Sequence, residues 1–325
     1  MMFCSSFIIN PYFFTIIFGI SLGALAASIF LPSLWIIWEW IPENKPITSG
    51  ILLTGYSLGP IPFSILFTVL VNPQNYQAIK VGNDFMFEKN VAENVPSGIR
   101  LFSIVLLVSA WIGLLLLPWE KKVLCNQVQS TNQKSVKDLL QSFRFWNLFV
   151  MMMFSMCCQG YAQTMYKVIA IKFINDDYYS TYVGMCAFFV GGVGRGTFGY
   201  LINRFYWKKV MSLVYLVQII LMLGLWFTLD DKILYALFIV LYNFTIGSLY
   251  NNVLLLTENE FPGEKKVISF VCLSFIISLF IPYLMDKIIT PFIGYLLTFV
   301  VVAGFSITLL AQTIFYKEKI TNKTY

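Results

Sequence analysis

The apolar residues of this chain come in long runs that no charged residue interrupts. The stretch 210–228, for example, contains no Lys, Arg, Asp or Glu. A run of about 18 such residues is long enough to cross the roughly 30 Å hydrocarbon core of a bilayer. Because a segment in lipid must satisfy its own backbone hydrogen bonds, each run is expected to be a helix. The sequence therefore predicts an all-α, polytopic, integral membrane protein.

Runs of this kind recur along most of the chain. We expect nine membrane-spanning helices, at about 12–38, 50–71, 100–118, 145–172, 178–202, 209–229, 232–256, 267–285 and 291–316. The composition agrees, because only 12% of the residues are charged, against about 25% in soluble proteins. A surface with so few charges favours contact with a lipid bilayer.

The basic residues indicate how the helices are oriented. If the C-terminus is cytoplasmic, the inner loops hold 14 of the 22 Lys and Arg residues and the outer loops hold 6. The remaining two, Lys167 and Arg195, lie inside predicted spans. This bias follows the positive-inside rule. The net charge of +6 therefore indicates membrane topology, not a nucleic-acid partner.

A polar, Lys-containing stretch at 119–144 separates the first three predicted spans from the last six. A long basic cytoplasmic loop in front of a six-helix block is typical of the midpoint of a transporter built from two halves. We therefore expect a partial N-terminal half at 1–118 and a C-terminal half at 145–316, with a cytoplasmic tail at 317–325. The alternative is a truncated relative of a transporter that no longer transports.

Enzymatic function is not expected from this sequence. The glycines Gly194, Gly196 and Gly199 form a GxGxxG pattern, but a dinucleotide site needs a strand before it, and here the pattern lies within an apolar span. The chain contains no His, which removes the commonest general base and metal ligand. No cofactor or metal is predicted.

Five polar side chains within spans are candidate substrate ligands. An Arg inside a span is costly and usually functional, so Arg195 is expected either to contact an anion or to bond to helix carbonyls. Gln159, Gln163 and Tyr166 share one helix face, where they could line a solute path or join helices by hydrogen bonds. Lys167 lies close to an outer helix end and could reach the interface instead of a substrate. All 16 acidic residues lie in loops or at span ends, so an intramembrane proton relay is not expected.

Several segments together resemble the major facilitator superfamily, in its oxalate/formate antiporter-like and monocarboxylate-transporter-like branch. They are Trp40–Gly50 with Gly55–Gly59, similar to the region between the fourth and fifth helices; Tyr166-Lys167, Asn175–Asp177 and Gly192–Gly199, similar to the seventh and eighth; and Tyr242–Leu249, similar to the tenth. The likeness covers about residues 12–316, and the first three helices of the family have no counterpart.

This resemblance implies a secondary transporter that works by alternating access on a small organic anion, monocarboxylate-like in character. It also implies that Arg195 matches the eighth-helix arginine that contacts a substrate carboxylate. Two features depart from the branch. Gly191 stands where proton-coupled carriers have an aspartate, and 267–285 contains no counterpart of the eleventh-helix lysine of oxalate carriers. The oligomeric state is left open.

Overall fold

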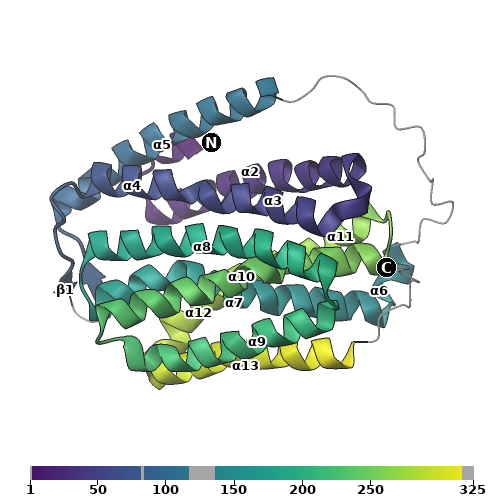
Figure 1. Cartoon of the computed structure of the whole chain (residues 1–325). Helices are drawn as coiled ribbons and strands as arrows, with labels where there is room; N and C mark the ends of the chain where they lie inside the picture. Colours follow the sequence, from purple (N-terminus) through teal and green to yellow (C-terminus); the bar gives the residue numbers. More distant parts are fainter. Residues whose placement is uncertain (1, 82–83, 117–135, 317–325) are drawn as a thin grey trace. The chain divides into compact units, whose positions relative to one another are not determined.

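The computed structural model describes residues 2–81, 84–116 and 136–316 (Figure 1). The chain forms two compact units. One unit contains Met1–Trp35 and Pro62–Asn132, and the other contains Ile36–Ile61 and Gln133–Tyr325. We call them the first and the second unit and describe each by itself.

The first unit is built from helices and one short hairpin. Its elements are α1 (Met2–Ser5), most of α2 (Pro11–Trp40), most of α4 (Pro60–Val71), β1 (Ile79–Val81), β2 (Asp84–Met86) and α5 (Lys89–Leu116). The two strands pair antiparallel, with Ile79 opposite Met86. Helix α5 packs closely on α4, because a Cβ atom on Gly98 would lie 3.0 Å from Val71 Cγ2.

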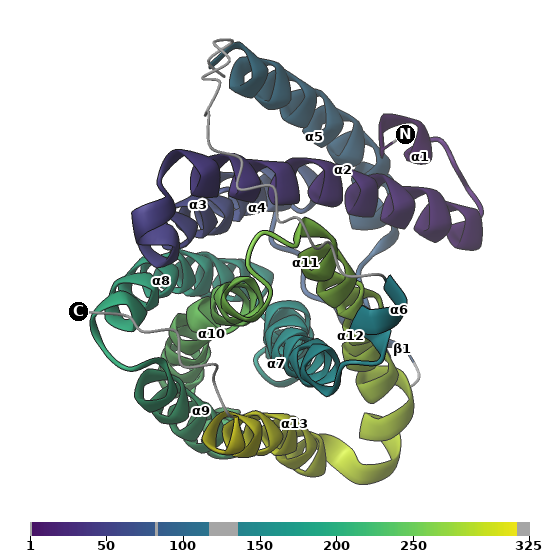
Figure 2. The ribbon, with the colours of Figure 1, turned by 90° about the vertical axis from the view of Figure 1, so that its right-hand side faces the viewer.

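The second unit contains the remaining helices. They are η1 (Pro42–Asn44), α3 (Lys45–Leu58), α6 (Val136–Leu140), α7 (Phe143–Phe173), α8 (Asp177–Arg204), α9 (Trp207–Gly224), η2 (Leu225–Thr228), α10 (Lys232–Glu260), α11 (Lys265–Cys272), α12 (Ser274–Leu284), the π-helical turn η3 (Met285–Ile289) and α13 (Thr290–Phe315). Seen nearly along its helices, this unit has α10 between α7 and α8, with α9 beside α13 (Figure 2).

Aspartate side chains cap the N-termini of two of these long helices. Asp176 accepts a hydrogen bond from the backbone N–H of Tyr179 at the start of α8, at 3.0 Å. Asp231 accepts hydrogen bonds from the N–H groups of Ile233 and Leu234 at the start of α10. These caps satisfy amide groups that have no partner inside the helix. They explain why both helices begin at the acidic residues that follow the preceding apolar runs.

The prediction of an all-α membrane protein is confirmed, and the hairpin contributes the only strands among the described residues. Six helical stretches there are long and apolar enough to cross a membrane. Helix α7 is not among them, because Asn147, Gln159 and Gln163 lower its mean hydropathy. Each predicted span overlaps a helix or a run of successive helices. The number of helices that cross the bilayer stays a prediction.

Two predicted spans differ from the helices in instructive ways. Helix α5 begins at Lys89, well before residue 100. The hydropathy pattern misses its first turns because they are polar; they include a Lys89–Glu93 ion pair one turn apart. The predicted span 267–285 is interrupted where α11 ends at Cys272 and α12 begins at Ser274. Hydropathy shows neither feature, since it measures apolar length and not backbone continuity.

The division into halves around 119–144 stays a prediction. Residues 117–135 lie outside the described part of the chain, and the rest of that stretch contains α6 and the start of α7. The segment Ile36–Ile61, which we assigned to the N-terminal half, belongs to the same compact unit as the last helices.

Candidate substrate site

Glycines bring three helix backbones of the second unit together around Arg195. A Cβ atom on Gly50 of α3 would lie 2.8 Å from the carbonyl oxygen of Arg195. On the α10 side, a Cβ atom on Gly247 would lie 2.7 Å from the Arg195 backbone nitrogen. Real Cβ atoms do not approach so closely, so only glycine fits at either position. The backbone of α8 is thereby held between α3 and α10 at this residue.

The same close packing continues in both directions along α8. The hydroxyl of Thr54 donates a hydrogen bond to the carbonyl oxygen of Gly192 at 2.9 Å. One side of Gly199 faces α3, where an added Cβ atom would lie 2.7 Å from the carbonyl oxygen of Pro46. These glycines lie within a continuous helix. Their pattern therefore serves helix packing.

The Arg195 side chain is buried at 5% exposure. No residue that the structure describes forms a hydrogen bond or an ion pair with its guanidinium. The hydroxyl-bearing ring of Tyr56, on α3, is near enough to act on it electrostatically. Neither a helix carbonyl nor an acid of the described chain therefore neutralises this cation. The site holds a permanent positive charge with little water around it.

Three acidic residues of the second unit are engaged in ion pairs away from Arg195. Three ion pairs join segments that are far apart in the sequence: Lys45–Glu258 at 2.8 Å, Arg144–Glu260 at 2.8 Å and Lys265–Glu39 at 2.6 Å. All three involve the C-terminal end of α10 or the start of α11, at the end of the bundle predicted to face the cytoplasm. Among the described residues, no group of three His, Cys, Asp or Glu side chains could hold a metal ion.

Lys167 has a protein partner, unlike Arg195. Its ammonium lies 2.7 Å from Oδ1 of Asp177, which is buried at 7% exposure, and 3.3 Å from the hydroxyl of Thr181. We expected Lys167 either to reach the interface or to contact substrate, and we missed this pair. In the sequence, Asp177 is recognisable only as an acid at a helix end. Its approach to Lys167 depends on the turn between α7 and α8.

The polar face of α7 is present but is not wholly satisfied. The amide nitrogen of Gln159 donates a hydrogen bond to Oε1 of Gln163 at 3.3 Å. Oε1 of Gln159 is buried, and no described residue donates to it. The Tyr166 ring lies edge-on to Phe188 and its hydroxyl fills the space beside Gly184. The face is thus partly bonded within its own helix and partly packed on α8.

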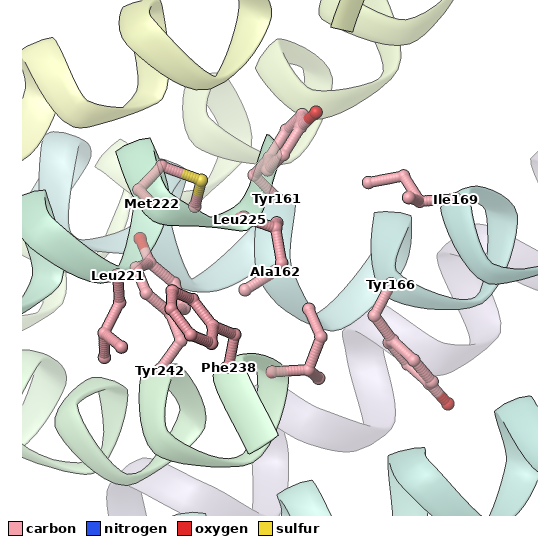
Figure 3. A pocket seen from close by; sticks show the side chains of 10 residues that line it. Tyr161, Ala162, Tyr166, Ile169, Leu221, Met222, Leu225, Phe238 and Tyr242 are labelled. Atoms are coloured by element: carbon pink, nitrogen blue, oxygen red, sulfur yellow. The ribbon is translucent and has the colours of Figure 1, made fainter. Parts of the chain in front are cut away.

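A small cavity lies beside Tyr166, with a volume of about 10 Å³. Its walls come from α7, α9, η2 and α10 and are almost wholly apolar. Figure 3 shows the hydroxyls of Tyr161 and Tyr166 directed away from the other lining side chains. This volume accommodates about one water molecule. It is too small for an organic anion, and Arg195 is not part of its wall.

The structure separates the predicted ligands into two groups. Lys167 and Tyr166 meet α8 at Thr181 and Gly184, which precede Arg195 by 14 and 11 residues. At 1.5 Å per residue these contacts lie about 21 and 16 Å away along the helix axis. Arg195 is therefore at a different depth from Lys167 and Tyr166.

Comparison with known proteins defines the class to which this bundle belongs. The sequence profile of the Major Facilitator Superfamily matches residues 1–270. The chain therefore belongs to the Major Facilitator Superfamily, and family and fold together support a secondary transporter, not an enzyme. No curated protein matches the sequence.

A solved structure shows the same fold. It is a Major Facilitator Superfamily transporter, FucP, in the outward conformation, which is 18% identical to this chain. The match covers 98% of this chain and 79% of that one, with a TM-score of 0.63. At this identity the likeness concerns fold alone. It agrees with an integral, multi-pass membrane protein.

Proposed function

We propose that this protein carries a small organic anion, monocarboxylate-like in character, by alternating access. Within the superfamily we place it in the oxalate/formate antiporter-like and monocarboxylate-transporter-like branch. One observation supports this most strongly. Arg195 is a buried cation to which no described residue supplies a counter-charge. A bound carboxylate supplies that charge.

Guanidinium is well suited to this task. Its planar N–H donors bind the two oxygens of a carboxylate in parallel, a geometry that the point charge of an ammonium does not reproduce. Opposite charges attract more strongly where little water surrounds them. Substrate binding would therefore relieve the cost of keeping Arg195 desolvated.

The charge balance around the site favours a single negative charge on the substrate. A monoanion bound to Arg195 forms a neutral complex. A second carboxylate would need a second cation, and Lys167 is already paired with Asp177 at 2.7 Å. The charge balance therefore supports monocarboxylates over dicarboxylates, with Lys167 as a support of the helix pair α7–α8.

Gln159, Gln163 and Tyr166 remain proposed ligands for the uncharged part of the solute. The free Oε1 of Gln159 is the atom that best supports this, since it can accept a hydrogen bond from a hydroxyl or amide. These groups lie on another helix from Arg195. In an alternating-access cycle they would act at a different stage or on a different end of the solute.

Binding and uptake measured on the full chain in liposomes test the proposal. A set of small monocarboxylates is compared with the corresponding neutral amides, in wild type and in Arg195→Lys and Arg195→Gln variants. We expect Lys to weaken anion binding sharply and Gln to abolish it, with expression unchanged. The amides should bind no better than background.

The matched control is Arg204→Gln. Arg204 lies on the same helix, is exposed and donates to the hydroxyl of Tyr200 at 3.1 Å. This variant should retain wild-type anion binding. Unchanged anion binding in Arg195→Gln, or equal loss in both variants, would contradict the substrate role of Arg195.

A further inference from the structure

A pocket of about 180 Å³ lies in the first unit, between the loop that follows α4 and the first turns of α5. Its apolar wall includes Val71 at the end of α4 and Val91 on α5, which are 7% and 5% exposed. In the predicted topology, residues 72–99 lie on the outer side of the membrane. The pocket belongs to a different unit from Arg195, and the proposed anion site uses none of its residues.

Hydrogen bonds hold both sides of this pocket in place. The side chain of Asn72 donates to the carbonyl oxygen of Tyr76 at 3.1 Å and accepts from the Tyr76 N–H at 2.8 Å, which closes the loop on itself. The amide nitrogen of Asn94 donates to the carbonyl oxygen of Val71 at 3.2 Å and so ties α5 to the end of α4. Because these bonds form within the protein, a ligand would not have to order the pocket on binding.

The polar part of the pocket wall consists of amide side chains. Asn90 and Asn94 are one turn apart on one face of α5, at a spacing of about 5–6 Å, and Gln74 comes from the loop. A side-chain amide both donates and accepts hydrogen bonds. None of the described residues that line the pocket carries a charge. Since an ion without a counter-charge is costly to desolvate, the wall favours an uncharged ligand.

The arrangement of these amides narrows the class of ligand. Amides at separate points of the wall favour a ligand with hydrogen-bonding groups all round its edge, whereas a nucleobase carries them close together on one edge. A pyranose sugar has hydroxyls round its ring and apolar C–H faces, which suit the ring of Tyr76 and the apolar wall. The volume is below the roughly 300–1,000 Å³ of pockets for drug-sized ligands, so it fits a single ring.

We propose that this pocket binds the ring of an uncharged monosaccharide on the outer side of the membrane. Gln74, Asn90 and Asn94 bond to its hydroxyls, and Tyr76 packs against one C–H face. A free sugar and the headgroup of a glycolipid present the same ring, so the experiments below distinguish these two sources. The site is independent of Arg195 and of the proposed substrate.

Saturation-transfer NMR with methyl glucoside, on the full chain in phosphatidylcholine nanodiscs, tests the proposal. We expect transfer to the sugar in wild type and binding weaker by roughly two- to tenfold in Gln74→Leu and in Asn90→Leu, because each variant loses a neutral hydrogen bond. Gln77→Leu is the matched control, since Gln77 is exposed, follows Tyr76 and does not line the pocket. No transfer in wild type, or equal binding by Gln74→Leu and Gln77→Leu, overturns the proposal.

Competition against methyl glucoside tests the chemical class of the ligand. Methyl glucuronide has the same ring with one carboxylate, and it should bind at least severalfold more weakly because the described pocket wall supplies no cation. Uracil should not displace the sugar, since its polar groups reach only one amide at a time. Displacement by uracil at the concentration of the glucoside, or tighter binding of the glucuronide, contradicts the assignment to an uncharged sugar.

Two further measurements identify the source of the sugar and separate this site from the anion site. Nanodiscs that contain monoglucosyl diacylglycerol should raise the melting temperature of wild type but not of Gln74→Leu if the ring is a glycolipid headgroup. Binding of methyl glucoside without this rise assigns the pocket to a free sugar, and the absence of both overturns the proposal. Arg195→Gln should bind methyl glucoside as wild type does, so that failure of the anion hypothesis leaves this result unaffected.

Discussion

Two basic side chains lie within apolar segments of the second unit, and their surroundings differ. Lys167 reaches a carboxylate at 2.7 Å and a hydroxyl at 3.3 Å, at the start of α8. Arg195, further along the same helix, lies between glycine-lined backbones, and its guanidinium bonds to none of the described residues. The first cation is completed by the fold. We propose that the second is completed by a bound substrate anion.

This contrast assigns different roles to two residues that look alike in sequence. A paired cation lowers the free energy of the folded protein, and removing one partner leaves the other uncompensated. A cation without a partner raises it, and such a cost persists where binding or transport requires it. Substitutions at the two cations and at the contacts around them should therefore change stability by different amounts and in different directions.

The largest effect is expected where α8 meets α10. Gly247→Ala would place a methyl group 2.7 Å from the backbone nitrogen of Arg195. The other atom at this distance is the carbonyl oxygen of Gly191. Because both atoms belong to the backbone of α8, helices α8 and α10 must move apart, at a cost of about 3 kcal/mol or more. Thermal unfolding in detergent measures it. Gly304→Ala on α13 is the control, since nothing lies within 4 Å of its added Cβ atom; equal melting of both variants would refute the close-contact argument.

Breaking the Lys167 pair should have the next largest effect. Asp177→Asn removes the charge that faces Lys167, which leaves an ammonium without compensation between α7 and α8. Loss of one partner of a buried pair costs about 3–5 kcal/mol. The Lys167 side chain is 34% exposed, so solvent screening reduces our expectation to about 1–3 kcal/mol. Lys167→Gln in the same background should recover part of the loss, and absence of recovery would argue against a direct pair.

Arg195→Gln should change stability in the opposite direction. Removing a buried cation that has no protein partner relieves a desolvation cost, so unfolding should require on the order of 1 kcal/mol more free energy. Lys167→Gln should be destabilising under identical conditions. The pair of melting temperatures checks this directly, without any substrate. A drop in both variants would show that Arg195 has a structural partner after all.

The smallest effect is expected for the exposed ion pair Lys265–Glu39. Both side chains are about half exposed, at 55% and 54%, and such pairs contribute about 0–1 kcal/mol. Glu39→Gln should therefore melt close to wild type. Glu260→Gln is the informative companion, because Glu260 is 4% exposed and faces Arg144. If both variants melt alike, burial does not decide the strength of these pairs.

Much of the fold follows from the sequence because apolar length alone identifies membrane helices. The same criterion fails where helices have polar turns, as in the start of α5 at Lys89, or break inside an apolar run, as at Leu273. For the site, the sequence singled out Arg195 as costly, and the structure adds its lack of a partner among the described residues. The partnership of Lys167 with Asp177 could not be predicted, because it depends on how the chain turns between two helices.

The ion pair between Arg144 and Glu260 has a consequence for how the protein is made. Arg144 is at the start of α7, and Glu260, at the end of α10, follows 116 residues later. Ribosomes synthesise the chain from its N-terminus, so Arg144 has no partner until α8, α9 and α10 have been synthesised and Glu260 is present. Lys45 and its partner Glu258 are separated by a still longer stretch, 213 residues. Completion of α10 is therefore the moment during biosynthesis when both of these early cations can first find their partners.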